Sequence, residues 1–395
     1  MKKIVISLML TAIIFVNPVV FSESVVQTST GDVVYSDGNE TKLNTNAPSS
    51  VLIDAESGRI LYEDNKDERR AMASITKVMT LLLTMEALDK GVLTLEQKLV
   101  CSEHAKSMGG SEIWLEVGEE MTVNDLLKAV AVNSANDAAV VLAEAIGGTE
   151  DIFVEMMNQR ASELGMVNTC FKNSNGLDEE GHFSSAYDIA LMSKELLKHK
   201  AILNYTTIWT DTLRDGKTEL ANTNKLIRYY KGATGLKTGF TNDAGYCLSA
   251  SAQRDGLHLI AVVLGCKSID ERLSGVKELL NYGFSTYCYY TPEIDSSTFP
   301  KIKVLLGSRE YATIKEPEIS GFIIKKDRKN EISYECSFLS DVMAPIDENQ
   351  TLGTITFKCK DEVLATYSLK ASDNIPKLSF SSTFCCLFLK YIFMK

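Results

Sequence analysis

The alternation of hydrophobic and polar residues divides the chain into a region that mixes helices with strands and a later region of strands alone. Two apolar runs between residues 50 and 65 flank Ser57 and Gly58, which predicts a β-hairpin. Apolar runs between residues 233 and 266 predict further strands, with a turn at Arg254-Asp255-Gly256. Amphipathic spacing predicts helices at residues 74–91, from Thr122, after Ser134, at 185–199 and at 270–284.

Strands at both ends of the first region enclose its helices, so we expect one sheet assembled from distant segments and covered by helices. A chain of 395 residues is long enough for two domains. The first is predicted at residues 45–288 and has mixed α/β character. The stretch 291–300 marks a boundary, and short alternating runs after it predict a small all-β domain at residues 292–373.

The first 24 residues have the pattern of a secretory signal peptide. Lys2 and Lys3 give a charged start, residues 4–16 are apolar and uncharged, and small polar residues follow. A buried N-terminal helix is the alternative interpretation. Residues 25–44 are polar and rich in turn-forming residues, which predicts a linker. We therefore expect an exported protein.

The tail at residues 378–395 is apolar and aromatic, with Lys390 and Lys395. It is shorter than the roughly 20 apolar residues that a membrane-spanning helix needs. We expect it to lie at a membrane surface as an interfacial anchor. The alternatives are a disordered tail or a strand that packs on the β domain.

Charge, cysteine and histidine content argue against several functions. The formal net charge of -11 leaves no basic field to attract nucleic acid phosphates. The nine cysteines are scattered and contain no C-x-x-C pair, so no disulfide framework is expected. Cys247 and Cys266 are predicted to be buried thiols. The four histidines have no metal-binding spacing, so no metal site is expected.

Ser74 and Lys77 form an S-x-x-K pattern at the start of an apolar helix. Positions i and i+3 share one helix face, and a desolvated lysine can accept a serine proton. The alternative makes Ser74 a helix cap and Lys77 a solvated side chain. The same spacing recurs at Ser274 and Lys277, which we interpret as an ordinary surface helix.

Two further motifs accompany this pair. The stretch "NSAND" places Ser134 and Asn136 between two helices, where Ser134 could also be a cap. The stretch "GLKTGFT" places Lys237, Thr238 and Gly239 at a strand, where a glycine would let a substrate backbone approach the strand edge. The alternative interpretation of this second stretch is a turn before a strand. Each motif is common alone, whereas the ordered set S-x-x-K, S-x-N, K-T-G is not.

On these motifs the chain resembles penicillin-binding proteins and serine β-lactamases, and most closely the low-molecular-mass D-alanyl-D-alanine carboxypeptidases of peptidase family S11. Supporting stretches are "VLIDAESGRILYEDN", "NSNGLDEEGHFSSAYDIALM" and "GLKTGFTNDAGYCLSASAQRDG". The resemblance implies a serine β-lactamase/transpeptidase-like α/β (α+β) domain, with an antiparallel sheet covered by helices, followed by the small all-β domain. It also implies a location at the outer face of the cytoplasmic membrane or in the cell wall.

The resemblance assigns a role to each matching residue. Ser74 would be the acylated nucleophile, Lys77 its general base, and Ser134 a proton relay to the leaving group. Asn136 would hold Lys77 and the substrate amide, and Lys237 would support Ser134. The remaining substrate-binding residues are Thr238 and Arg272 for the terminal carboxylate, Gly239 in the K-T-G motif, and Phe240, whose N–H would complete an oxyanion hole with that of Ser74. Some relatives have histidine where this chain has Phe240.

The implied reaction is acyl transfer to Ser74 from a peptidoglycan stem peptide that ends in D-Ala-D-Ala, followed by hydrolysis of the ester. β-Lactam antibiotics would act as covalent inhibitors. No metal or organic cofactor is implied.

Four other functions compete with this prediction. A class A β-lactamase would carry an E-x-x-L-N pattern, which is missing between Asn136 and Lys237. A D,D-endopeptidase of the same family would cut a cross-link instead of a terminal residue. A non-catalytic wall-binding protein would not need the intact motifs. A Ser-His-Asp hydrolase would need a G-x-S-x-G elbow, which is absent.

Overall fold

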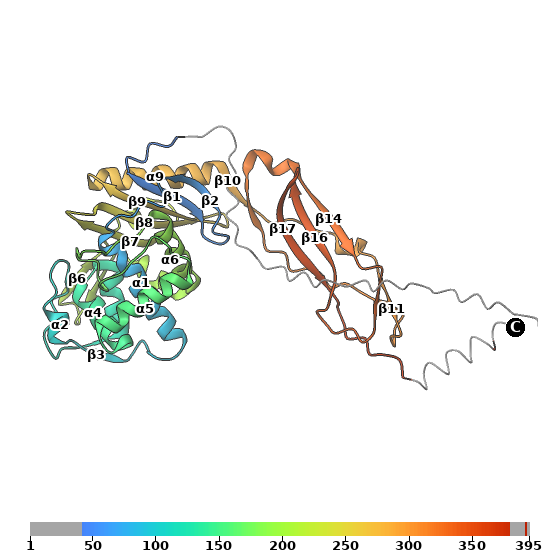
Figure 1. Cartoon of the computed structure of the whole chain (residues 1–395), viewed down its shortest axis with the longest axis horizontal. Helices are drawn as coiled ribbons and strands as arrows, with labels where there is room; N and C mark the ends of the chain where they lie inside the picture. Colours follow the sequence, from blue (N-terminus) through green and yellow to red (C-terminus); the bar gives the residue numbers. More distant parts are fainter. Residues whose placement is uncertain (1–41, 380–391, 393–395) are drawn as a thin grey trace, which may run out of the picture. The chain divides into compact units, whose positions relative to one another are not determined.

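The computed structural model describes residues 42–379 and residue 392 (Figure 1). The predicted signal peptide, most of the predicted linker and almost all of the predicted tail lie outside these residues.

A five-stranded antiparallel sheet forms the centre of the first region (Figure 1). The expected hairpin is confirmed, because β1 (Ser49–Asp54) pairs with β2 (Ile60–Asp64). β1 also pairs with β9 (Leu257–Cys266), which comes much later in the chain. The sheet continues through β8 (Gly245–Arg254) to β7 (Ala233–Thr241), which forms its edge. The prediction of a sheet built from distant segments is confirmed.

Helices cover both faces of this sheet. α9 (Ile269–Thr286) lies over one face, and α1 (Lys77–Asp89) and α6 (Ala186–Lys198) lie under the other (Figure 1). The alternation of β1 produces two cores: Val51 and Ile53 enter one with α1 and α6, and Leu52 enters the other with α9.

Among the described residues, six further α-helices and two pairs of short strands belong to the same region. The helices are α2 (Glu103–Lys106), α3 (Val123–Lys128), α4 (Asn136–Gly147), α5 (Glu150–Glu163), α7 (Leu203–Thr206) and α8 (Leu226–Tyr229). Two antiparallel strand pairs are β3 (Lys98–Val100) with β4 (Glu120–Thr122), and β5 (Thr210–Leu213) with β6 (Thr218–Ala221).

Polar caps explain where several of these helices begin. The Thr122 hydroxyl accepts a hydrogen bond from the Asp125 N–H, as its spacing predicts. Ser185 and Ser268 accept equivalent bonds at the starts of α6 and α9. α9 also contains the second S-x-x-K pair, and there Ser274 is exposed and bonds its hydroxyl to the carbonyl of Glu271. This confirms Ser274 as an ordinary surface residue.

A β-rich region follows, as expected. β11 (Ile302–Leu305) lies between β12 (Tyr311–Ala312) and β15 (Asp341–Met343), while β16 (Thr351–Cys359) lies between β14 (Ile332–Phe338) and β17 (Glu362–Lys370). Two further strands, β10 (Tyr287–Tyr290) and β13 (Phe322–Lys325), pair with each other. The alternating runs did not predict β10, β13 or β15.

Cys247 and Cys266 are buried free thiols, as predicted. Burial raises the pKa of the Cys247 thiol to about 11 and that of the Cys266 thiol to about 12. Within residues 42–379 and at residue 392, no helix combines the length and the apolar character needed to cross a membrane.

Candidate active site

Ser74 lies in a 3₁₀ turn, Ala73–Thr76, directly before α1. The residue before it, Ala73, has a left-handed backbone with φ 48°. The alternative interpretation of Ser74 as a helix cap is wrong, because Met72 occupies the capping position and no side chain caps the turn. The Ser74 hydroxyl is instead hydrogen-bonded to the amine of Lys77.

Lys77 is fully buried, which excludes the alternative that it is a solvated side chain. Its Nζ lies 2.9 Å from Ser74 Oγ, 2.5 Å from Asn136 Oδ1 and 2.6 Å from the carbonyl oxygen of Asn175. Burial lowers the pKa of this amine well below its ordinary value; nearby Lys237 lowers it further, whereas Asp137 opposes the change.

A neutral amine has two N–H donors and one lone pair. The two carbonyl oxygens that contact Lys77 Nζ cannot donate, so they take the two N–H groups. When the amine is neutral, its lone pair is therefore directed to the remaining neighbour, Ser74 Oγ, 2.9 Å away. This geometry allows a proton to pass from the serine hydroxyl to the lysine amine.

Ser134 and Asn136 follow a π-helical stretch, Ala129–Asn133, that ends before α4. Ser134 has a left-handed backbone with φ 65° and ends the π-helical stretch, and Ala135 holds the capping position of α4, so Ser134 is not the cap that starts α4. The Asn136 side chain is fixed at both ends, because its Nδ2 also donates to the Gly109 carbonyl at 2.5 Å.

Lys237, Thr238 and Gly239 lie within β7, the edge strand of the sheet, and not in a turn before it. Burial, aided by the nearby Arg272, lowers the pKa of the Lys237 amine to about 7. Thr238 Oγ1 lies 2.7 Å from the hydroxyl of Thr223. A Cβ on Gly239 would lie 2.8 Å from the Met72 carbonyl oxygen, so only glycine lets β7 pass this close to the turn that carries Ser74.

Arg272 and Phe240 differ in their surroundings. The Arg272 guanidinium is buried behind β7, where it donates to the carbonyls of Gly239 and Cys247 and lies 5.6 Å from the Tyr246 ring. Its Nε is buried without a hydrogen-bond partner. Phe240 is half exposed and stacks on Tyr246 with 4.3 Å between ring centroids.

A chain of hydrogen bonds that the motifs did not predict supports the 3₁₀ turn that carries Ser74. The Lys172 N–H donates to His182 Nδ1, so the ring proton is on Nε2, which lies 2.7 Å from Thr76 Oγ1. The Thr76 hydroxyl donates in turn to the carbonyl of Ala73 at 2.8 Å. His182 lies in the quoted "GHFSSAYD" stretch, yet a lone histidine there gave no signal of this contact.

Gly176 closes the same turn from the other side. A Cβ at this position would overlap the Ala73 carbonyl, so a glycine with φ 89° is required. Its neighbour Asn175 supplies the carbonyl that holds Lys77. Main-chain groups of this kind carry no residue signature, so the sequence could not have identified Asn175.

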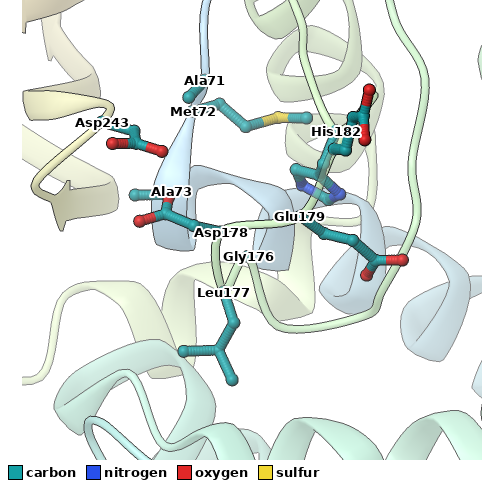
Figure 2. Close-up of a pocket in the computed structure, with 10 residues that line it drawn as sticks. Ala71, Met72, Ala73, Gly176, Leu177, Asp178, Glu179, His182 and Asp243 are labelled. Atoms are coloured by element: carbon teal, nitrogen blue, oxygen red, sulfur yellow. The ribbon is translucent and has the colours of Figure 1, made fainter.

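A pocket of about 290 Å³ borders the turn that carries Ser74 (Figure 2). Ala73, the 176–179 loop, His182 and Asp243 line it (Figure 2). None of the nine predicted site residues lines it, so it lies beside the candidate catalytic groups. Among residues 42–379 and 392, no cluster of three or more His, Cys, Asp or Glu side chains could bind a metal ion.

Two family models match the chain. One, described as D-alanyl-D-alanine carboxypeptidase, matches residues 35–268, and the other, described as the C-terminal domain of penicillin-binding protein 5, matches residues 295–377. The curated D-alanyl-D-alanine carboxypeptidase DacF of Bacillus subtilis is 45% identical over 349 residues, which cover 87% of this chain and 90% of the relative. DacC of Escherichia coli is 30% identical over 345 residues, 85% of this chain and 86% of the relative.

Solved structures agree with these matches. The crystal structure of penicillin binding protein 5 from Haemophilus influenzae has a TM-score of 0.73 at 27% identity and covers 86% of this chain and 99% of its own. Penicillin-binding protein D2 from Listeria monocytogenes, solved in the ampicillin-bound form, has a TM-score of 0.56 at 34% identity. It covers 60% of this chain and 98% of its own.

The burial of His182 predicts a dependence of stability on pH. Burial lowers its pKa from 6.5 to about 4, so between these values the unfolded chain binds more protons than the folded one. The free energy of unfolding should therefore fall as pH drops from 6.5 to 4, by up to roughly 3 kcal/mol for this residue. His182→Gln keeps a side-chain donor for Thr76 but cannot titrate, so urea unfolding at pH 4, 5 and 7 should show a weaker pH dependence.

His258, whose pKa burial also lowers to about 4, provides a matched second site. The double variant with His258→Gln should be less pH-dependent than either single variant. An unchanged pH dependence in His182→Gln would contradict a buried neutral imidazole.

Proposed function

The chain belongs to the D-alanyl-D-alanine carboxypeptidase family, the S11 serine peptidases, and we propose that Ser74 is the nucleophile that removes the terminal D-alanine from peptidoglycan stem peptides. The observation that carries this proposal is the contact between Ser74 Oγ and the fully buried Lys77 amine. Ser274, which has the same S-x-x-K spacing, is exposed on α9 and bonds to the carbonyl of Glu271 instead.

In the first step, neutral Lys77 takes the proton of Ser74 as Oγ forms a bond to the carbonyl carbon of the penultimate D-alanine. The N–H groups of Ser74 and Phe240 stabilise the oxyanion. The carbon–nitrogen bond then breaks, and Ser134 relays the proton from Lys77 to the leaving amine. Terminal D-alanine departs and an ester with Ser74 remains.

In the second step, water attacks the ester while Lys77 accepts its proton, and the bond to Ser74 Oγ breaks as that oxygen is protonated again. Asn136 keeps the Lys77 amine in place through both steps. A β-lactam would react in the first step and leave a slow acyl-enzyme.

Substrate binding is assigned to β7 and the residues behind it. Because β7 is a sheet edge, its free side can pair with an extended peptide. Thr238 and Arg272 receive the terminal carboxylate, and Lys237 adds positive charge near Ser134 when protonated. Its pKa of about 7 makes that charge dependent on pH in the physiological range.

Ser74→Ala should abolish both activities that the mechanism requires. Release of D-alanine from a diacetylated Lys-D-Ala-D-Ala peptide should fall by at least about 10³-fold, because the nucleophile is lost. Stable labelling by a fluorescent penicillin should disappear as well. Ser274→Ala removes the serine with the same S-x-x-K spacing and is the matched control, which should retain both activities.

Two results would contradict the assignment of this function or of Ser74 as the nucleophile. Penicillin that is hydrolysed rapidly without D-alanine release would indicate a β-lactamase. Labelling that persists in Ser74→Ala would show that another residue is acylated.

We also propose an organisation for the whole chain. Residues 1–24 direct export, and residues 25–44 link this signal to a catalytic domain at 45–288. A β domain at 292–373 then leads to a membrane-associated tail.

One feature of the β domain supports the membrane association of the tail. Leu305 and Met343 are paired neighbours on β11 and β15 and both are exposed, as is the adjacent Leu306. The Leu378 N–H bonds to the Leu306 carbonyl, so this apolar surface adjoins the start of the apolar tail.

The tail proposal can be tested by flotation with vesicles that contain phosphatidylglycerol. The full chain should float with the vesicles, and a chain ending at Ser379 should remain largely unbound, because most of the apolar and aromatic anchor is gone. Equal flotation of the two forms would assign membrane binding to another part of the chain.

A further inference from the structure

Trp114 combines exposure with an unfavourable backbone conformation. Its side chain is 70% exposed, and its φ of 53° lies in the left-handed region. A large non-glycine residue rarely adopts this conformation, and a large indole in water forgoes the burial that usually stabilises it. Strain of this kind persists only where surrounding contacts impose it, and it concentrates at functional sites.

Hydrogen bonds from two side chains, the buried Asp137 and the partly exposed Arg214, hold this conformation. The fully buried Asp137 carboxylate accepts hydrogen bonds from the N–H groups of Ile113 at 3.2 Å and Leu115 at 3.0 Å. The Arg214 guanidinium donates to the carbonyls of Ile113 at 2.9 Å and Trp114 at 3.4 Å. Glu119 in turn bonds Arg214 Nε at 2.6 Å. The indole is therefore held outward by a fixed main chain.

Hydrogen bonds connect the segment around Trp114 to the candidate catalytic residues. Asp137 directly follows Asn136, whose side chain holds Lys77. The side chain of Asn133, which precedes Ser134, donates to the Glu112 carbonyl. The contacts from Trp114 through Asp137, Asn136 and Lys77 limit the separation between the indole and Ser74 Oγ to at most about 25 Å. Four extended peptide residues span about 13–14 Å, which lies within this limit.

The residues next to Trp114 indicate which class of ligand its indole could bind. Ile113 and Leu115 are buried, whereas Trp114 is exposed and its sequence neighbours Glu112 and Glu116 are partly exposed and exposed. Glu116 also pairs with Lys106 at 2.9 Å. Carboxylates accept hydrogen bonds from hydroxyl groups and repel anionic phosphates. A flat apolar indole between such groups suits a neutral ring with an apolar face and hydroxyl edges, which describes a pyranose.

We propose that Trp114 is a stacking platform for a sugar ring of the glycan strand to which the stem peptide is attached. The proposal rests on the proposed function, since the glycan reaches Trp114 when the fourth residue of its peptide lies at Ser74. The platform makes the chain prefer peptides that are still joined to glycan over free peptides.

Glycan binding can be measured without catalysis. The chain has two tryptophans, so Trp209→Phe leaves Trp114 as the only indole. Titration of this variant with the β-1,4-linked tetramer of N-acetylglucosamine should change the tryptophan emission with saturation. The same titration in the Ser74→Ala background should give the same curve, which keeps this test independent of the catalytic proposal.

A second test compares two substrates. The ratio of kcat/KM for a disaccharide-linked pentapeptide to kcat/KM for the diacetylated tripeptide should fall about tenfold in Trp114→Gly. Glycine adopts the left-handed backbone freely, so the Tm of Trp114→Gly should equal or exceed that of the parent. Trp114→Phe should restore part of the ratio. Tyr229→Ala, which removes another exposed aromatic ring, is the matched control and should keep the parent ratio.

Three results would overturn the platform. The first is an unchanged substrate ratio in Trp114→Gly. The second is a lower Tm in Trp114→Gly together with loss of activity on both substrates, which would make Trp114 a structural residue. The third is emission that responds to phosphatidylglycerol vesicles but not to the tetrasaccharide, which would assign the indole to a lipid surface.

Discussion

The complete burial of the Lys77 amine is the constraint on which the rest of the site depends. Burial disfavours the charged amine, and no carboxylate among the described residues is in contact with it: its contacts are one hydroxyl and two neutral carbonyl oxygens. The acid that favours its charge, Asp137, has its oxygens occupied by backbone N–H groups. The surroundings therefore favour the neutral amine, and the mechanism we propose uses its lone pair as the base.

The fold explains how this amine and its serine are held together. Lys77 is the first residue of α1, and the turn before it is compressed between β7 and the 175–176 segment. Glycines at 176 and 239 permit this approach, and the Thr76–His182 contact fixes the Ala73 carbonyl between them. The catalytic pair is thus positioned by packing between segments that lie far apart in the chain.

The sequence predicted the elements and the motifs better than the contacts between them. The hairpin at 50–65, the capped helix from Thr122 and the strands at 233–266 follow from local patterns, which set each element independently. The ordered motifs indicated Ser74, Lys77 and Asn136, and the structure brings these three together. The carbonyl of Asn175 and the support from His182 could not be predicted, because main-chain acceptors have no residue signature and long-range contacts depend on the packed fold. The left-handed backbones of Ala73 and Trp114 were missed for a related reason: these residue types do not favour that conformation, and tertiary contacts impose it.

The most direct test of this account is the pKa of Lys77 itself. An NMR titration of the chain with ¹³C-labelled lysine side chains, assigned with Lys77→Arg, would follow its ionisation. The account predicts a pKa well below the ordinary 10.5, and a higher one in Lys237→Gln, because a neighbouring cation is removed. A Lys77 that titrates near 10.5, with no response to the change at Lys237, would contradict a neutral base at Ser74.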